Sequence, residues 1–215
     1  PFQATFTPEF ADRLREAFKL PKQFSEPHHR DWYGYDLELL TGQDLLQASV
    51  GWSTNYYLKP EAYTDEWGVE WKIDPYETPF GTGHYTNIAR NPLRDNDEAA
   101  MAYKAPDPHR PELYTNITRL VKEYGNEYFI IGRIHCTIFE SAWALRGLDV
   151  LMTDFYINPD LTNHLLDETF NYHKEVAKKM AHLGVDMIWL GDDMGAQDAL
   201  MIDPDLWREF FKGRM

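Results

Sequence analysis

The chain has 215 residues, of which 43% are hydrophobic, and a formal net charge of −14 at pH 7. This length and apolar share suit one globular domain over 1–215. The sequence contains no run of about 18 apolar residues that could cross a membrane. The acidic balance argues against nucleic acid or anionic lipid as partners. The single cysteine, Cys136, cannot form an internal disulfide, so we expect a cytoplasmic protein.

The N-terminal part of the chain is rich in aromatic residues and has few clear elements. Helical spacing of apolar side chains predicts a short helix over 8–19, and residues 45–58 are compatible with a strand, best over 45–50. A strand-like alternation starts at Trp67. Residues 74–96 carry many Gly, Pro, Asn and Thr, which indicates a hairpin or excursion loop rather than core.

From residue 111 onward the pattern becomes regular. Apolar spacing predicts a series of helices over 111–124, 139–146, 148–156, 159–183 and 204–211. Short apolar runs over 128–132 and 185–190 predict two buried parallel strands. Alternating strands and helices of this kind are the signature of an α/β fold with a parallel sheet.

Two acidic residues directly follow the second of these strands, in the stretch Gly191-Asp192-Asp193-Met194-Gly195. In parallel α/β folds, residues just beyond the carboxyl ends of strands face the ligand site, so Asp192 and Asp193 are candidate catalytic residues for acid-base work. Neighbouring side chains diverge, so we expect at most one to face a cavity while the other caps a helix or pairs. The alternative is that both are loop and cap residues without a chemical role.

A second candidate group follows the first strand. His135 lies at the end of that strand and Glu140 at the start of the next helix, which places both at the same edge of the sheet. His135 and Cys136 are adjacent, and adjacent side chains rarely chelate one metal, so we expect no complete zinc site there. We interpret His135 as a candidate catalytic residue and Glu140 as a substrate-binding residue, against the alternative of a packed histidine and a buried cysteine.

Aromatic residues near a carboxylate form the third candidate group. Trp52 and Tyr56 lie in one aromatic stretch, and Asp65 and Trp67 follow it. Rings and amides beside a carboxylate could cradle a flat organic ligand, so all four residues are predicted to bind substrate. Cross-strand packing of the rings is the competing interpretation.

Four stretches of the chain share their order and spacing with one enzyme superfamily. They are Asp65 to Trp71, with an Asp-x-Trp-Gly pattern; Asn91-Pro92-Leu93, followed by Tyr103 and Pro106-Asp107-Pro108; Phe139 to Gly147; and Asp192 to Gly195 with Leu200 to Trp207. Together they resemble the uroporphyrinogen decarboxylase superfamily, which includes the cobalamin (corrinoid)-dependent methyltransferases. The resemblance extends over about residues 60–212.

The resemblance implies a TIM barrel, (β/α)₈, with its site at the carboxyl face of the strands. The family's chains are longer, so we expect this chain to form about the first half of such a barrel. For the methyltransferase branch the resemblance also implies zinc and a corrinoid carrier, with metal ligands from a His-x-Cys element and a later Cys outside this chain. A true decarboxylase would need no cofactor.

We therefore predict a methyltransferase of this superfamily that acts on a small methylated substrate or a methyl-corrinoid. A corrinoid protein and a second copy of the chain are its candidate partners. Uroporphyrinogen III decarboxylase of porphyrin biosynthesis is the alternative, although the arginine-rich motif of that branch is not found and the protein is acidic. Further alternatives are a non-catalytic binding module and a glycosidase with two carboxylates across the cavity.

Overall fold

The structure is a computed structural model that describes residues 1–6, 8–21, 35–50, 62–78 and 81–215. Its helices are α1 (Pro8–Phe18), α2 (Asp36–Leu40), α3 (Asp97–Ala102), the 3-10 helix η1 (Pro111–Tyr114), α4 (Thr115–Tyr124), α5 (Phe139–Arg146), α6 (Leu148–Ile157), α7 (Pro159–Leu183) and α8 (Pro204–Phe210). Its strands are β1 (Leu45–Ser49), β2 (Tyr63–Thr64), β3 (Glu70–Thr78), β4 (Gly81–Arg90), β5 (Phe129–Ile134) and β6 (Met187–Leu190). Trp52 and Tyr56, two of the predicted substrate-binding residues, lie outside the described residues.

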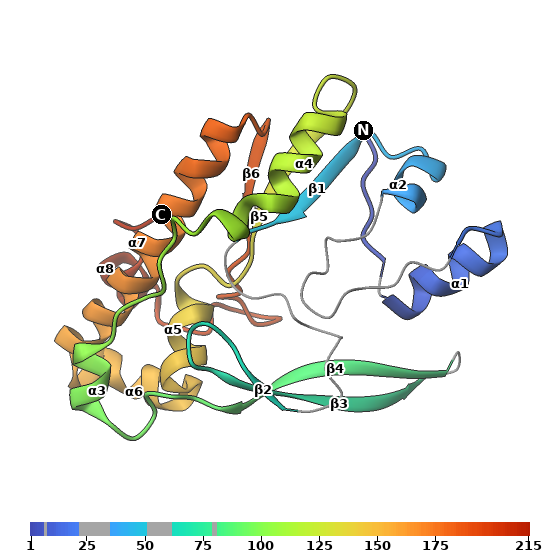
Figure 1. The fold of residues 1–215 in the computed structure, drawn as a ribbon. Coiled ribbons are helices and arrows are strands. Elements are labelled where there is room, and N and C mark those ends of the chain that lie inside the picture. Colours follow the sequence, from blue (N-terminus) through green and yellow to red (C-terminus); the bar gives the residue numbers. More distant parts are fainter. Residues whose placement is uncertain (7, 22–34, 51–61, 79–80) are drawn as a thin grey trace.

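Three strands form a parallel sheet in the order β1-β5-β6, and α4 and α7 pack on one of its faces (Figure 1). Side chains alternate along a strand, and on this face Ile130 and Ile134 of β5 are fully buried together with Leu46 of β1. Between the two isoleucines, Gly132 leaves room for α7, because a Cβ there would lie 2.6 Å from the sulfur of Met180. The predicted α/β fold with a parallel sheet is confirmed.

The opposite face of this sheet is only partly covered by the described residues. Phe129 of β5 is 44% exposed, and Met187 and Trp189 of β6 are 38% and 42% exposed. The guanidinium of Arg133 lies 4.7 Å from the centre of the Trp189 ring. The strand predicted over 185–190 is present as β6, but the prediction that it is buried is wrong. Within the described sheet β6 pairs on one side only, and an apolar run in the sequence does not reveal whether both faces are covered.

Strands β3 and β4 form a long antiparallel hairpin, joined at its base by β2 (Figure 1). The hairpin extends from Glu70 to Arg90, so it starts before the segment 74–96 in which the sequence predicts a hairpin or excursion loop. Tyr76 lies opposite Gly83, and its ring packs over the glycine backbone, where a Cβ would be 2.4 Å from the ring unless the tyrosine moved. The base of the hairpin contributes to the hydrophobic core, whereas its outer part is exposed.

The predicted helices are present at their expected positions, whereas the short helices α2 and α3 were not predicted. α7 has Pro159 in its first turn and ends at Gly184, whose φ of 91° suits glycine. α8 begins behind Asp203, whose carboxylate accepts the N–H of Asp205 at 2.7 Å. The helix expected over 111–124 begins as the 3-10 helix η1. No helix among the described residues is both long enough and apolar enough to span a membrane.

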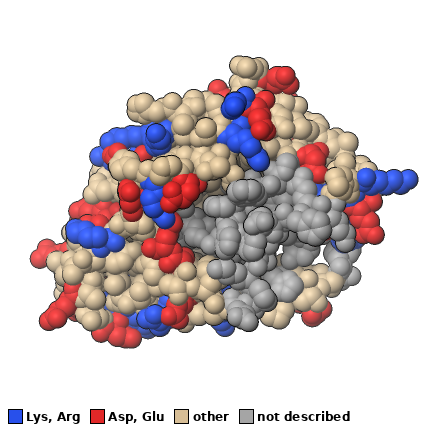
Figure 2. All heavy atoms as spheres, viewed as in Figure 1, with Lys and Arg blue, Asp and Glu red and all other residues tan. Residues whose placement is uncertain are grey.

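Charged side chains are distributed over the surface. Figure 2 shows basic and acidic groups interspersed over the described part of one face, without a single basic patch. Several form exposed ion pairs, such as Arg90 with Glu70 at 2.5 Å and Arg94 with Asp149 at 2.6 Å. Pairs of this kind contribute little stability each. The net charge of −14 creates an electrostatic field that attracts cations to the molecule.

Candidate functional site

The carboxyl ends of β5 and β6 lie side by side because the two strands are parallel neighbours. The backbone continues this contact beyond the strands. The N–H of Gly191 donates to the Ile134 carbonyl at 2.8 Å, and the N–H of Thr137 donates to the Gly191 carbonyl at 3.2 Å. The stretches 135–140 and 192–193, which the sequence singles out separately, are thus adjacent in space.

Asp192 binds the amino-terminal end of α5. Its carboxylate accepts the backbone N–H groups of Ile138 at 3.0 Å, Phe139 at 2.9 Å and Glu140 at 2.9 Å. The N-cap residue of α5 makes no side-chain capping bond, so a residue from the following strand end satisfies these amides. Burial raises the pKa of the Asp192 carboxyl, and the amide bonds partly offset the increase. The expectation that one of the two aspartates caps a helix is confirmed.

Glu140 is held between the two strand ends. Its Oε2 accepts the backbone N–H of Asp193 at 3.1 Å, whereas the Asp193 side chain is exposed. Burial, together with the nearby Asp192 and Asp193 carboxylates, raises the pKa of the Glu140 carboxyl to about 7. A carboxyl that titrates near neutral pH can take up or release a proton under ordinary conditions, as acid-base residues do.

A cavity of about 490 Å³ lies between α5 and the β3–β4 hairpin, and is called the α5 cavity below. Its lining includes Trp71, Tyr85 and Asn87 from the hairpin, and Cys136, Glu140 and Trp143 from the end of β5 and from α5. Of these residues, the sequence predicted only Glu140 as substrate-binding. Trp143 was missed although its signal is visible, because it lies three residues after Glu140 and hence on the same helix face.

The other ionisable groups of the α5 cavity are paired or neutral. Lys72 borders the cavity, and its Nζ lies 3.1 Å from the Asp74 carboxylate. Burial, and next the Glu140 and Asp192 carboxylates, raise the pKa of the Cys136 thiol, so this thiol stays protonated at neutral pH. Among the described lining residues, Glu140 is therefore the acidic group without an oppositely charged partner.

Asp65 and Trp67 lie in a turn within the core rather than in the α5 cavity. Asp65 Oδ1 accepts the N–H groups of Trp67 at 2.8 Å and Val69 at 3.0 Å, and its Oδ2 accepts the Trp71 indole N–H at 2.7 Å. Trp67 is 2% exposed, and its ring stacks on His173 at 5.6 Å. Burial raises the pKa of the Asp65 carboxyl to about 6, although these three hydrogen bonds lower it. Asp65 thus shapes the turn and holds Trp71, whose ring borders the cavity.

His135 and Cys136 diverge, as expected for neighbours. The His135 ring meets the Trp189 ring edge-on at 5.7 Å, whereas Cys136 borders the α5 cavity. Within the described residues there is no group of three or more His, Cys, Asp or Glu that could hold a metal ion. The residues that the structure describes thus do not fit a zinc site.

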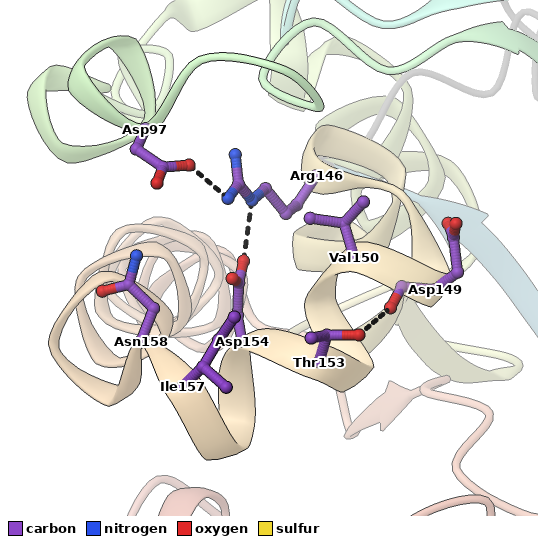
Figure 3. Close-up of a pocket in the computed structure, with 8 residues that line it drawn as sticks. All are labelled: Asp97, Arg146, Asp149, Val150, Thr153, Asp154, Ile157 and Asn158. Carbon is purple, nitrogen blue, oxygen red and sulfur yellow. Dashed lines mark hydrogen bonds and ion pairs between the residues drawn. The ribbon is translucent and has the colours of Figure 1, made fainter.

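A second cavity, of about 530 Å³, lies beside the buried Arg146 at the end of α5 (Figure 3). Arg146 donates from Nε to Asp154 at 2.7 Å, from Nη1 to the Leu93 carbonyl at 2.7 Å and from Nη2 to Asp97 at 2.5 Å. These bonds join α5 to α6 and to the segment that leads from β4 into α3. Because that segment follows the hairpin directly, Arg146 fixes the two walls of the α5 cavity relative to each other.

The family model described as uroporphyrinogen decarboxylase (URO-D) matches residues 77–215, more than half of the chain. The chain belongs to the uroporphyrinogen decarboxylase family. The resemblance seen in the sequence motifs is thereby confirmed, and the matched range includes Cys136, Glu140 and Asp192.

A solved structure similar to this chain is a methyltransferase from Methanosarcina mazei, with 19% sequence identity and a TM-score of 0.48. The similarity covers 66% of this chain and 41% of the methyltransferase, so the chain spans less than half the length of that protein. A comparison with the curated proteins gives no match.

Proposed function

We propose that this protein is a methyltransferase of the uroporphyrinogen decarboxylase superfamily, built on a (β/α)₈ barrel to which the described residues contribute a part. The parallel sheet supports the barrel. One face is covered by α4 and α7, while the other carries the exposed Phe129, Met187 and Trp189. Parallel sheets occur almost only with both faces covered, and in a barrel the second face is the packed interior. A cytoplasmic location, a corrinoid protein partner and a homo-oligomer are part of the same proposal.

The composition of the α5 cavity is the observation that carries the choice of chemistry. Its walls include Trp71 and Trp143, and its charged groups are Glu140 and Lys72, which is paired with Asp74. Uroporphyrinogen has eight carboxylates, and the described lining offers no unpaired cation to receive them. An uncharged or cationic small substrate suits this cavity better, which favours the methyltransferase branch over the decarboxylase branch.

In this proposal Glu140 contacts the substrate and exchanges a proton with it or with solvent near neutral pH. Asp192 is a positioning residue, because it caps α5 and so fixes the backbone at Glu140. His135 and Asp193 lie at the same edge of the sheet, and the exposed Asp193 side chain is accessible to a substrate that extends beyond the cavity. Zinc and a corrinoid stay expectations from the family resemblance, with their binding residues outside those described.

A paired activity assay tests the proposal. Methyl transfer from methylcobalamin to a small thiol, and decarboxylation of uroporphyrinogen III, are measured with the complete natural protein and its Glu140→Gln variant. We expect methyl transfer in the wild type and a loss of about a hundredfold in kcat in the variant, because one acid-base group contributes on the order of 10²–10⁴-fold.

The matched control is Glu123→Gln, which removes an exposed glutamate on α4 and leaves the rate unchanged. Porphyrinogen turnover without methyl transfer would establish the decarboxylase instead. Absence of both activities would favour the non-catalytic binding module.

A further inference from the structure

We propose that the α5 cavity binds a methylated ammonium group, with the Glu140 carboxylate as its counter-ion and the Trp71 and Trp143 side chains as its walls. This inference rests on the proposed function and specifies the class of its small methylated substrate: an organic cation such as a quaternary or tertiary amine. Three properties of the α5 cavity support it: its aromatic walls, its charge and its size.

The aromatic walls come from two separate elements. Trp71 belongs to the base of the β3–β4 hairpin, and Trp143 lies one turn after Glu140 on α5. Asp65 accepts the Trp71 indole N–H at 2.7 Å, which holds that side chain in place. The faces of tryptophan rings attract cations because of their quadrupole, and methylated ammonium groups are the ligands that aromatic cages recognise.

The charge of the cavity also favours a cation. Glu140 is the acidic lining residue without a cationic partner, and the carboxylates of Asp192 and Asp193 lie close behind it. Lys72, the cation in the lining, is paired with Asp74. A positively charged ligand would gain from all three carboxylates, whereas an anionic ligand would be repelled by them.

The size of the cavity sets an upper limit on the ligand. About 490 Å³ is within the usual range for small-molecule sites. It accommodates a trimethylammonium headgroup with a short tail.

Binding of a cation is expected to be linked to the protonation of Glu140. The groups close to Glu140 are Asp192 and Asp193 from the end of β6 and Cys136 from the end of β5, and Lys72 and Tyr85 line the same cavity. A cation favours the carboxylate form, so binding is weakened wherever Glu140 is protonated in the free protein. Because its pKa is raised to about 7, affinity should improve about tenfold from pH 6 to pH 8 and then level off.

Isothermal titration calorimetry with choline tests the inference, with 3,3-dimethyl-1-butanol as a neutral ligand of the same shape. We expect saturable binding of choline at pH 8 and at least about tenfold weaker binding of the alcohol. Glu140→Gln should weaken choline binding about tenfold and remove its pH dependence. Trp143→Phe keeps an aromatic ring and should weaken binding about threefold, because phenylalanine is the poorer cation partner. Glu123→Gln on α4 should bind as the wild type does.

Equal affinity for the two ligands, or choline binding unaffected by Glu140→Gln, would overturn the inference. The readout needs no methyl acceptor, so it is independent of turnover. If the protein transfers methyl groups from a neutral donor but does not bind choline, the proposed function stands and the inference fails. If choline binds as expected but no methyl transfer occurs, the site is a binding site and the proposed function fails.

Discussion

Asp192 and Asp193 are adjacent in the sequence but have opposite surroundings. Asp192 accepts three backbone N–H groups at the start of α5, whereas the Asp193 side chain is exposed. We expect Asp192→Asn to lower the free energy of unfolding by about 1–3 kcal/mol. The asparagine NH₂ group would replace one carboxylate oxygen, so backbone N–H groups of α5 would lose their acceptor and face another donor. Urea denaturation followed by circular dichroism measures this change.

Asp193→Asn is the matched control for this substitution. Its side chain makes no capping bond, so the expected change is below about 0.5 kcal/mol. Equal effects of the two substitutions would show that the contacts of Asp192 with α5 do not stabilise the fold.

The raised pKa values of Glu140 and Asp65 predict how stability depends on pH. Burial raises these values to about 7 and about 6, from ordinary values of 4.5 and 3.8. A raised carboxyl pKa means that the folded state binds the proton more tightly than the unfolded state. The stabilisation is therefore complete below the ordinary pKa and is lost as the pH rises through the folded value.

We accordingly expect the urea concentration at the unfolding midpoint of the wild type to decrease as the pH rises from 5 to 8. In Glu140→Gln the fall should be smaller, because one of the raised carboxyls has been removed. Measurements of the midpoint at several pH values in this range compare the two proteins. An identical fall in both would contradict the assignment of a raised pKa to Glu140.

Sequence spacing identified the residue types near the α5 cavity but not the contact that each one makes. Asp192 and Glu140 both follow strands, and only the three-dimensional structure distinguishes the capping carboxylate from the one at the cavity. Asp65 was predicted to bind substrate, yet its bonds to Trp67 and Val69 form a local turn. Aspartate favours such turns, so this signal was present in the sequence.

At the scale of elements, Arg146 connects α5, α6 and the segment after the hairpin (Figure 3). We expect Arg146→Met to lower the free energy of unfolding by about 3–5 kcal/mol, because the buried Asp154 carboxylate would lose its partner. Chemical denaturation measures the loss. Adding Asp154→Asn to the Arg146→Met variant should recover part of the lost stability, because the double variant has no unpaired buried charge.

Arg94→Met is the matched control at this scale. Arg94 pairs with Asp149 at the surface, and such a pair contributes about 0–1 kcal/mol. A loss from Arg146→Met no larger than that from Arg94→Met would mean that the buried arginine does not join these elements.

The predictability of an element depends on whether its signals are local. α7 was predicted at both ends because Pro159 and Gly184 mark them and apolar residues recur along its length. β6 was predicted correctly as a strand but wrongly as buried, because burial depends on what lies beside the strand. The β3–β4 hairpin was predicted too late in the chain, over 74–96, because pairing of Glu70 with Arg90 rather than residue type decides its boundaries.

At the scale of the whole molecule, the parallel sheet has helices on one face and exposed apolar side chains on the other. Exposed apolar patches favour association. We expect the 215-residue chain to bind an apolar fluorescent dye and to self-associate as its concentration rises. Met187→Lys should reduce both effects, because it places a charge among the exposed apolar side chains of this face.

Met101→Lys serves as the control for this experiment, since Met101 is 48% exposed on α3, away from the sheet. Dye fluorescence and sedimentation velocity provide the two readouts. Equal reductions in the two variants would assign the effect to net charge, and not to the sheet face.

The cap on α5 also determines when the site can form during synthesis. Asp192 lies 52 residues after Glu140, whose backbone N–H it holds. At about 5–20 residues per second, the ribosome needs roughly 3–10 s to add those residues. Until then the first turn of α5 lacks these bonds, so the α5 cavity is completed only after its own residues have been made.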